Sequence, residues 1–152
     1  MVDKQTIIKA LQEIVTTLSQ QADGHELQSR AFKALGYNKL AEIYAEHAEE
    51  ERGYVNQCAD RIYVIGGFVT CGVKQEYPIF TNPLECVKYD LAVSVEGLGQ
   101  LRNIMEVVKD DVTTFDLLKD YYKDEEEDLA WSERQIQMIS VIGEENWVLL
   151  QI

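Results

Sequence analysis

The sequence predicts an all-α protein, a single domain over residues 1–152 folded as a bundle of four long antiparallel helices with a short fifth helix at the C-terminus. Two observations carry this prediction. Apolar residues recur at steps of three and four over four long segments, which is the pattern of amphipathic helices. The two prolines, Pro78 and Pro83, both lie in mid-chain, so the segments on either side can form uninterrupted helices.

The first two helices are expected at residues 3–35 and 38–65, separated by a tight turn. Ile7, Leu11 and Ile14 begin the apolar stripe of the first helix, and Gly36 is a typical stop signal after it. The second helix ends at Gly66-Gly67. Its expected inner face carries Leu40, Ile43, His47, Glu51 (or Glu50), Tyr54, Cys58 and Ile62.

The third helix is expected at residues 83–109, after a non-helical stretch. Asn82-Pro83-Leu84-Glu85 is typical of a helix start, because Asn caps, Pro suits the first position and Glu reaches back to the cap. A short turn then leads to a fourth helix at 113–142, which Gly143 ends. Residues 144–150 form the short fifth helix, and its apolar segment Trp147–Leu150 is expected to be exposed on a monomer and to meet a partner.

The connection between the second and third helices is long. About 16 extended residues reach about 50 Å, and a helix of about 30 residues is about 45 Å long. The connection can therefore run back along the whole bundle and place the third helix parallel to the second. This gives two helical hairpins joined by one crossover.

The composition excludes several classes of partner. A net charge of −13, from 27 acidic and 14 basic residues, argues against binding a nucleic-acid backbone and favours metal cations. No apolar run approaches the roughly 20 residues of a membrane-spanning helix, and the N-terminus lacks the apolar core of a signal peptide. We therefore expect a cytoplasmic protein. Cys58, Cys71 and Cys86 are expected as free thiols, with a regulated Cys71–Cys86 pair as the alternative.

Oxygen donors lie on the expected inner faces of the second and fourth helices. Tyr54 follows Glu51 by three residues, and Asp128 follows Glu125 by three, so each pair projects to one side of its helix. Buried charges are costly unless they are paired or bound to metal, and such donors suit hard cations. The alternative is a hydrogen-bonded polar cluster in which the Tyr54 hydroxyl donates to Glu51 or Glu125.

The two histidines suggest a second arrangement. The tight turn between the first two helices places His25 opposite His47, and Glu51 follows His47 by four residues on one face. His25, His47 and Glu51 are therefore candidate metal ligands as well. Histidines of the core that bind no metal are the alternative.

Several motifs resemble those of one known family. They are Phe32-Lys33-x-x-Gly36, Arg61-Ile62, Asp90-Leu91-Ala92, Gly97-x-x-x-Leu101-Arg102, Asp124-Glu125-Glu126-x-x-x-x-Trp131, Gly143 and Gln151-Ile152. Over nearly its whole length the chain resembles a bacterioferritin subunit. The resemblance implies a ferritin-like bundle, non-haem iron, and a homo-oligomeric cage of 24 subunits, or of 12 as in the smaller Dps-like relatives.

The resemblance also implies where the metal ligands would lie, and here the chain departs from the family. The family's two-iron site has Glu, Glu, His, Glu, Glu and His at the positions of Leu18, Glu51, Tyr54, Ser94, Glu125 and Asp128. Arg52 stands where the family has its haem-binding methionine, so methionine-ligated haem is not expected. Arg52 is instead a candidate partner for an anionic flat ligand such as a flavin phosphate at a subunit interface.

Two functions follow as expectations. The first is an iron-binding, iron-storage cage subunit that oxidises Fe²⁺ at an altered carboxylate site inside the bundle. The second is a non-catalytic ferritin-like shell protein that has lost the ferroxidase centre and binds a cofactor at a subunit interface. The sequence leaves open whether the protein is an enzyme.

Overall fold

A computed structural model describes residues 2–152 and consists of five helices. They are α1 (Lys4–Ala34), α2 (Asn38–Val64), α3 (Pro83–Val108), α4 (Val112–Ile142) and α5 (Glu144–Leu149). Each helix begins and ends within one residue of its expected bounds, and residues 2–152 contain no strand. The prediction of an all-α bundle is confirmed. None of the helices in this range is long and apolar enough to cross a membrane.

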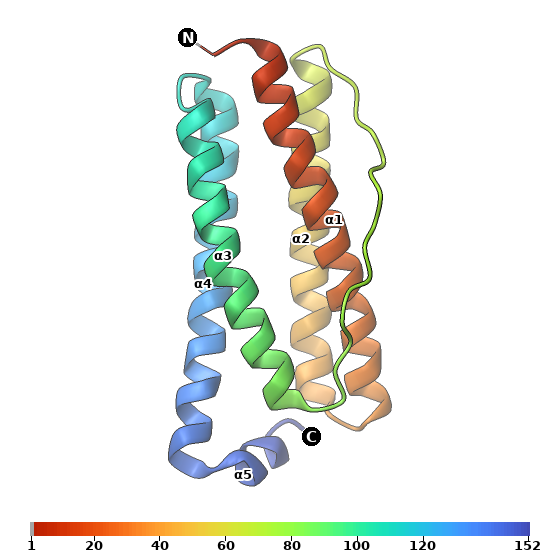
Figure 1. Cartoon of the computed structure of the whole chain (residues 1–152). Coiled ribbons are helices and arrows are strands. Elements are labelled where there is room, and N and C mark those ends of the chain that lie inside the picture. The colour runs from red at the N-terminus through yellow and green to blue at the C-terminus, as the bar shows by residue number, and fades with distance from the viewer. Residues whose placement is uncertain (1) are drawn as a thin grey trace.

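The helices form two antiparallel hairpins, α1 with α2 and α3 with α4 (Figure 1). A crossover, residues 65–82, runs back along the length of the bundle, so that α3 is parallel to α2 (Figure 1). Packing is much more extensive within each hairpin than between them. The two hairpins therefore meet along two seams, one between α1 and α3 and the other between α2 and α4.

Side-chain caps fix three of the helix starts. The Asp3 carboxylate accepts a hydrogen bond of 2.8 Å from the amide of Thr6 at the start of α1. Asn82 caps α3 at 3.0 Å, as the sequence predicts, and Asp111 caps α4. Each cap satisfies an amide that the helix itself leaves unpaired, which is worth about 1 kcal/mol.

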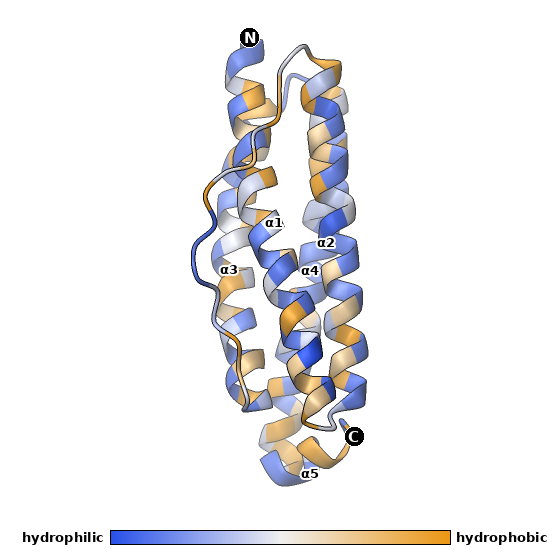
Figure 2. Ribbon diagram, turned by 90° about the vertical axis from the view of Figure 1, so that its right-hand side faces the viewer, coloured by the Kyte–Doolittle hydropathy of each residue, from blue (hydrophilic) through white to orange (hydrophobic). Residues whose placement is uncertain are grey.

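The apolar core is divided into two clusters, one toward each end of the bundle. Figure 2 shows how hydrophobic and hydrophilic residues alternate along each helix, as packing on one face requires. One cluster is centred on Leu11, Ile62 and Leu118. The other is centred on Phe32 and Tyr44. The chain positions between these two clusters carry the polar residues described below.

The C-terminal segment differs in part from the expectation. Trp147 is fully buried in the second cluster, and its indole nitrogen donates to the side chain of Gln135. The expected exposure of Trp147 was therefore wrong, because α5 folds back across the end of the bundle (Figure 1). Leu149, Leu150 and Ile152 are exposed.

Glutamine side chains of α1 hold the crossover against the bundle. Gln12 donates to the carbonyl of Thr70 at 3.0 Å and accepts from its amide at 2.9 Å. Gln28 makes the same pair of bonds with Phe80, at 2.8 and 2.7 Å. Gln20 donates to the crossover between these two points. Each amide group thus pairs with the extended backbone much as a neighbouring strand would.

Gly24 allows the crossover to approach α1 closely. A Cβ atom at this position would lie 2.3 Å from a ring carbon of Tyr77, well inside contact distance. Glycine weakens a helix interior, but α1 continues through Gly24. The glycine is required because the Tyr77 ring lies against the helix backbone.

We expect Gly24→Ala to destabilise the protein. In an open helix position alanine gains about 1 kcal/mol over glycine, but here the added methyl group must displace Tyr77 and strain the crossover. Gly99→Ala is the matched control, because Gly99 lies within α3 with no atom near its absent Cβ. Urea unfolding should show Gly99→Ala stabilised and Gly24→Ala destabilised. Equal stabilisation of both variants would contradict the packing of Tyr77.

Candidate functional site

All four long helices contribute polar side chains to a layer between the two apolar clusters. α1 supplies His25, α2 supplies His47 and Glu51, and α3 supplies Asp90, while Glu125 and Asp128 come from α4. The cavity among these side chains is small, about 10 Å³. That is about the space of one water molecule or one ion.

The imidazole of His25 joins two carboxylates across three helices. Nδ1 lies 2.5 Å from Oε1 of Glu51, and Nε2 lies 3.2 Å from Oδ1 of Asp90. Burial alone would lower the pKa of His25, but the charges and hydrogen bonds of Glu51 and Asp90 outweigh it and raise the pKa well above 6.5. His25 is therefore an imidazolium at neutral pH and donates to both carboxylates.

The second oxygen of Glu51 is left without a partner. Oε2 is buried and accepts no hydrogen bond from any described residue, although Oε1 is held by His25. Burial raises the pKa of Glu51, and His25 partly offsets this. The pairing of Glu51 with His25 matches the proximity that the sequence indicated.

His47 contacts Asp128 and not Glu51. Its Nε2 lies 3.5 Å from Oδ1 of Asp128, and its ring centroid lies 5.9 Å from that of His25. Burial, together with the charge of His25, lowers the pKa of His47 to about 4. His47 is thus neutral at physiological pH, the form in which imidazole binds metal. The two histidines face each other as predicted, but His25, His47 and Glu51 do not converge on one point.

Glu125 and Asp128 are carboxyl groups that hold their protons unusually well. Burial, followed by the charge of Glu51, raises the pKa of Glu125 to about 8. Burial and the charge of Asp124 raise the pKa of Asp128 to about 8. Both groups are therefore largely neutral at pH 7 unless a cation takes the place of the proton.

A cluster of three carboxylates lies at the edge of this layer, between α2 and α4. One oxygen from each of Glu50, Asp124 and Asp128 lies within 4.8 Å of the others, and no other such group of three occurs in residues 2–152. Burial and Asp124 raise the pKa of Glu50 to about 7. Sequence reasoning missed Asp124. It named Glu50 only as an alternative to Glu51, although Asp124 and Asp128 are one helical turn apart.

Tyr54 does not join the polar layer. Its ring packs on that of Tyr121, with centroids 5.1 Å apart, and it makes no hydrogen bond to Glu51 or Glu125. The alternative in which its hydroxyl donates to these carboxylates was therefore wrong. Leu18 belongs to the first apolar cluster, while Ser94 lines the small cavity.

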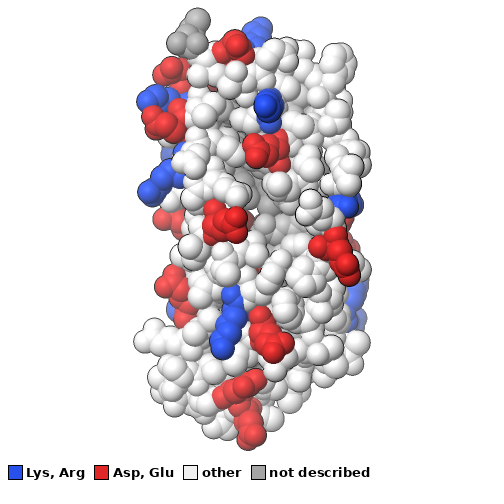
Figure 3. Space-filling model, viewed as in Figure 1, with Lys and Arg blue, Asp and Glu red and all other residues white. Residues whose placement is uncertain are grey.

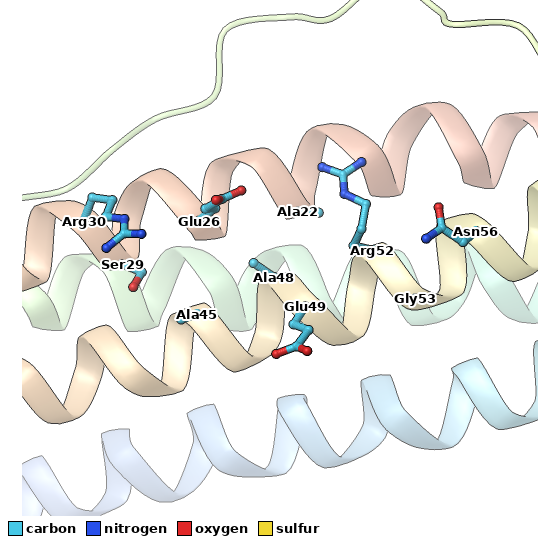
Figure 4. A pocket seen from close by; sticks show the side chains of 10 residues that line it. All are labelled: Ala22, Glu26, Ser29, Arg30, Ala45, Ala48, Glu49, Arg52, Gly53 and Asn56. Atoms are coloured by element: carbon cyan, nitrogen blue, oxygen red, sulfur yellow. The ribbon is translucent and has the colours of Figure 1, made fainter.

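Arg52 lies outside the polar layer. Its guanidinium donates to Asp23 at 2.6 Å, and it lines a surface cavity of about 580 Å³ between α1 and α2. Figure 4 shows Arg52 toward one end of this cavity and Arg30 toward the other. The cysteines Cys58, Cys71 and Cys86 are all free thiols, so the alternative Cys71–Cys86 disulfide is not formed.

Two helical hairpins joined by one crossover, with carboxylates and histidines between them, define the class of ferritin-like bundles. A family description, the ferritin-like domain, matches residues 8–142. The chain belongs to the ferritin family, and its relatives place it on the bacterioferritin-like side of that family.

The relatives match almost end to end. The chain is similar to the bacterial ferritin of Neisseria meningitidis serogroup B, with 30% identity over 100% of both chains. It is 29% identical to the bacterial ferritin of Pseudomonas aeruginosa over 96% of each chain. It is 24% identical to the bacterioferritin of Streptomyces coelicolor over 91% of this chain and 84% of that one.

The raised pKa of Asp128 makes the stability of the metal-free protein depend on pH. The folded state keeps the Asp128 proton up to about pH 8, whereas the unfolded state loses it near 3.8. The stability that protonated Asp128 contributes is therefore fully present below pH 3.8 and is lost as pH rises through about 8. We expect the free energy of unfolding of wild type, relative to Asp128→Asn, to fall by about 1–3 kcal/mol between pH 5 and 8. Urea unfolding in a chelator measures this, and parallel pH profiles for the two proteins would contradict it.

Proposed function

We propose that this chain is an iron-binding and iron-storing subunit that binds Fe²⁺ as its substrate at the Glu50–Asp124–Asp128 cluster. The observation that carries the proposal is the convergence of three carboxylate oxygens within 4.8 Å. Carboxyl groups packed this closely resist full ionisation, and a divalent cation that replaces their protons relieves the repulsion. Membership of the ferritin family supports iron as the cation.

The polar layer itself fits a two-iron centre poorly. Of the six positions that the family resemblance identifies, those of Leu18 and Ser94 carry no carboxylate, and Tyr54 packs on Tyr121. Glu51 is already held by His25, and the cavity of about 10 Å³ has room for one ion at most. The three carboxyl groups of the cluster favour binding of one Fe²⁺, and neutral His47 lies 3.5 Å from Asp128 on the inner side.

Anaerobic titration of the metal-free protein with Fe²⁺ tests this proposal. We expect one tight site per chain, weakened at least about tenfold by Asp128→Asn or Asp124→Asn because each removes a ligand. Asp116→Asn, an exposed change of equal charge on the same helix, should bind as wild type does. Saturation at two Fe²⁺ per chain, or equal affinity in all three variants, would overturn the proposal. An oxygen pulse then shows whether the bound Fe²⁺ is oxidised faster than in buffer.

A cage is the assembly that we propose for this function. Leu149, Leu150 and Ile152 form an exposed apolar end beside α5, and such patches usually meet a partner. A closed assembly of 24 or 12 copies would bury them. We expect Leu149→Asp to shift the sedimentation profile toward smaller species, while Val112→Asp, a control at an exposed apolar residue of α4, leaves it unchanged. A monomeric wild-type protein would contradict the cage.

A second candidate is a shell protein without ferroxidase activity that binds an anionic flat ligand such as a flavin. Two observations favour it: His25 occupies Glu51, and two guanidinium groups, Arg30 and Arg52, line the cavity of about 580 Å³. Arginine suits phosphate groups because its planar fork donates two parallel hydrogen bonds. The visible absorption of the purified protein tests it, because a bound flavin colours the protein yellow and Arg52→Gln should remove the colour.

A further inference from the structure

A cleft of about 430 Å³ opens between α1 and α3, on the face where the two hairpins meet loosely. Figure 3 shows a hollow near the middle of this face, with acidic side chains on either side of it. The volume is typical of a site for a small molecule. The crossover borders the cleft through residues 75–77, and α4 contributes Tyr121 and Glu125.

Two polar groups that line the cleft lack partners. Glu125 is only 6% exposed, and its carboxylate makes no hydrogen bond with another described residue. The hydroxyl of Tyr77 is buried, and it also has no partner among the described residues. Buried polar side chains are nearly always hydrogen-bonded. A ligand in the cleft would supply a donor to the carboxylate of Glu125.

The lining of the cleft selects for positive charge. It contains three carboxylates, three phenol rings and four side-chain amides, and none of the described residues lining it is Lys, Arg or His. These residues are Glu76, Glu96, Glu125, Tyr77, Tyr89, Tyr121, Gln20, Gln21, Gln75 and Gln100. Carboxylates and amide carbonyls accept hydrogen bonds from ammonium groups, and phenol rings attract cations through their faces.

The carboxylates of the cleft are spread out and do not surround a point. The only close group of three ligand atoms in residues 2–152 is Glu50–Asp124–Asp128, and Glu125 is the one carboxylate of the polar layer that lines the cleft. The α3 residues that line it, Tyr89 to Ile104, span about 22 Å of helix. A metal ion needs converging ligands, whereas a linear cation can pair with separated charges.

We propose that this cleft binds a linear aliphatic polyamine. One ammonium group pairs with Glu125, and another pairs with Glu96 or Glu76 nearer the surface. The methylene chain between them lies along apolar lining residues such as Leu101 and Ile104. The site is distinct from the Fe²⁺ cluster, so each proposal can fail without the other.

Calorimetric titration with spermidine, a linear triamine, tests the inference on metal-free protein in a buffer that contains Mg²⁺. Magnesium saturates the general attraction of an acidic surface for cations. We expect one site per chain, weakened at least about tenfold by Glu125→Gln because a buried ion pair is removed. Glu145→Gln, an exposed change of the same charge on α5, should bind as wild type does.

The variants are checked for folding by thermal unfolding without spermidine, where Glu125→Gln should be at least as stable as wild type because it removes a buried carboxylate. Equal affinity of Glu125→Gln and Glu145→Gln would overturn the inference, since only overall charge would then matter. Binding of several spermidine molecules per chain that Mg²⁺ abolishes would overturn it too. A full loss of binding in Glu125→Gln with unchanged Fe²⁺ affinity would support a cleft site separate from the iron cluster.

Discussion

The imidazole of His25 lies between two buried carboxylates, and the packing of the helices around it depends on the charge that it carries. Glu51 comes from α2 and Asp90 from α3, so the two contacts join both hairpins through α1. A neutral imidazole would turn one ring nitrogen with a lone pair toward a carboxylate. Removing one partner of a buried ion pair commonly costs about 3–5 kcal/mol. The imidazolium supplies the positive charge that carboxylates inside such a bundle otherwise take from metal.

Near neutral pH, Glu125 and Asp128, the other two acidic residues of the layer, are kept neutral by burial and not by an ion pair. Burial raises the pKa of both Glu125 and Asp128 to about 8, so at rest they hold protons. A cation that binds at Asp128 must release its proton, and cation affinity therefore rises with pH. Asp128 has two connections, because it faces His47 within the layer and Glu50 and Asp124 at the edge. It links the buried layer to the acidic surface.

The sequence patterns predicted the helices and the inward residues but not Asp124, one of the three residues of the cluster. Periodicity and capping gave the bounds, and the tight first turn correctly placed His25 opposite His47. Glu51 and Glu125 were expected on the inner faces of their helices, and both are buried. Asp124 was not predicted because it directly precedes the inward Glu125, and on a single helix such a position faces solvent. In the structure, packing of α2 beside α4 brings Glu50 close to Asp124.

The path of the crossover cannot be predicted from the periodicity of the helices. It meets α1 through the neutral amide groups of three glutamines and through an ion pair between Lys74 and Asp23. These contacts, together with the missing side chain of Gly24, place the ring of Tyr77 against α1, where Tyr77 lines the cleft. The hairpins meet loosely on that face, so the cleft reaches inward as far as Glu125. A topological connection thus becomes one wall of the proposed binding site, because the residues that hold the crossover in place also bring Tyr77 into the lining of a cleft that reaches Glu125.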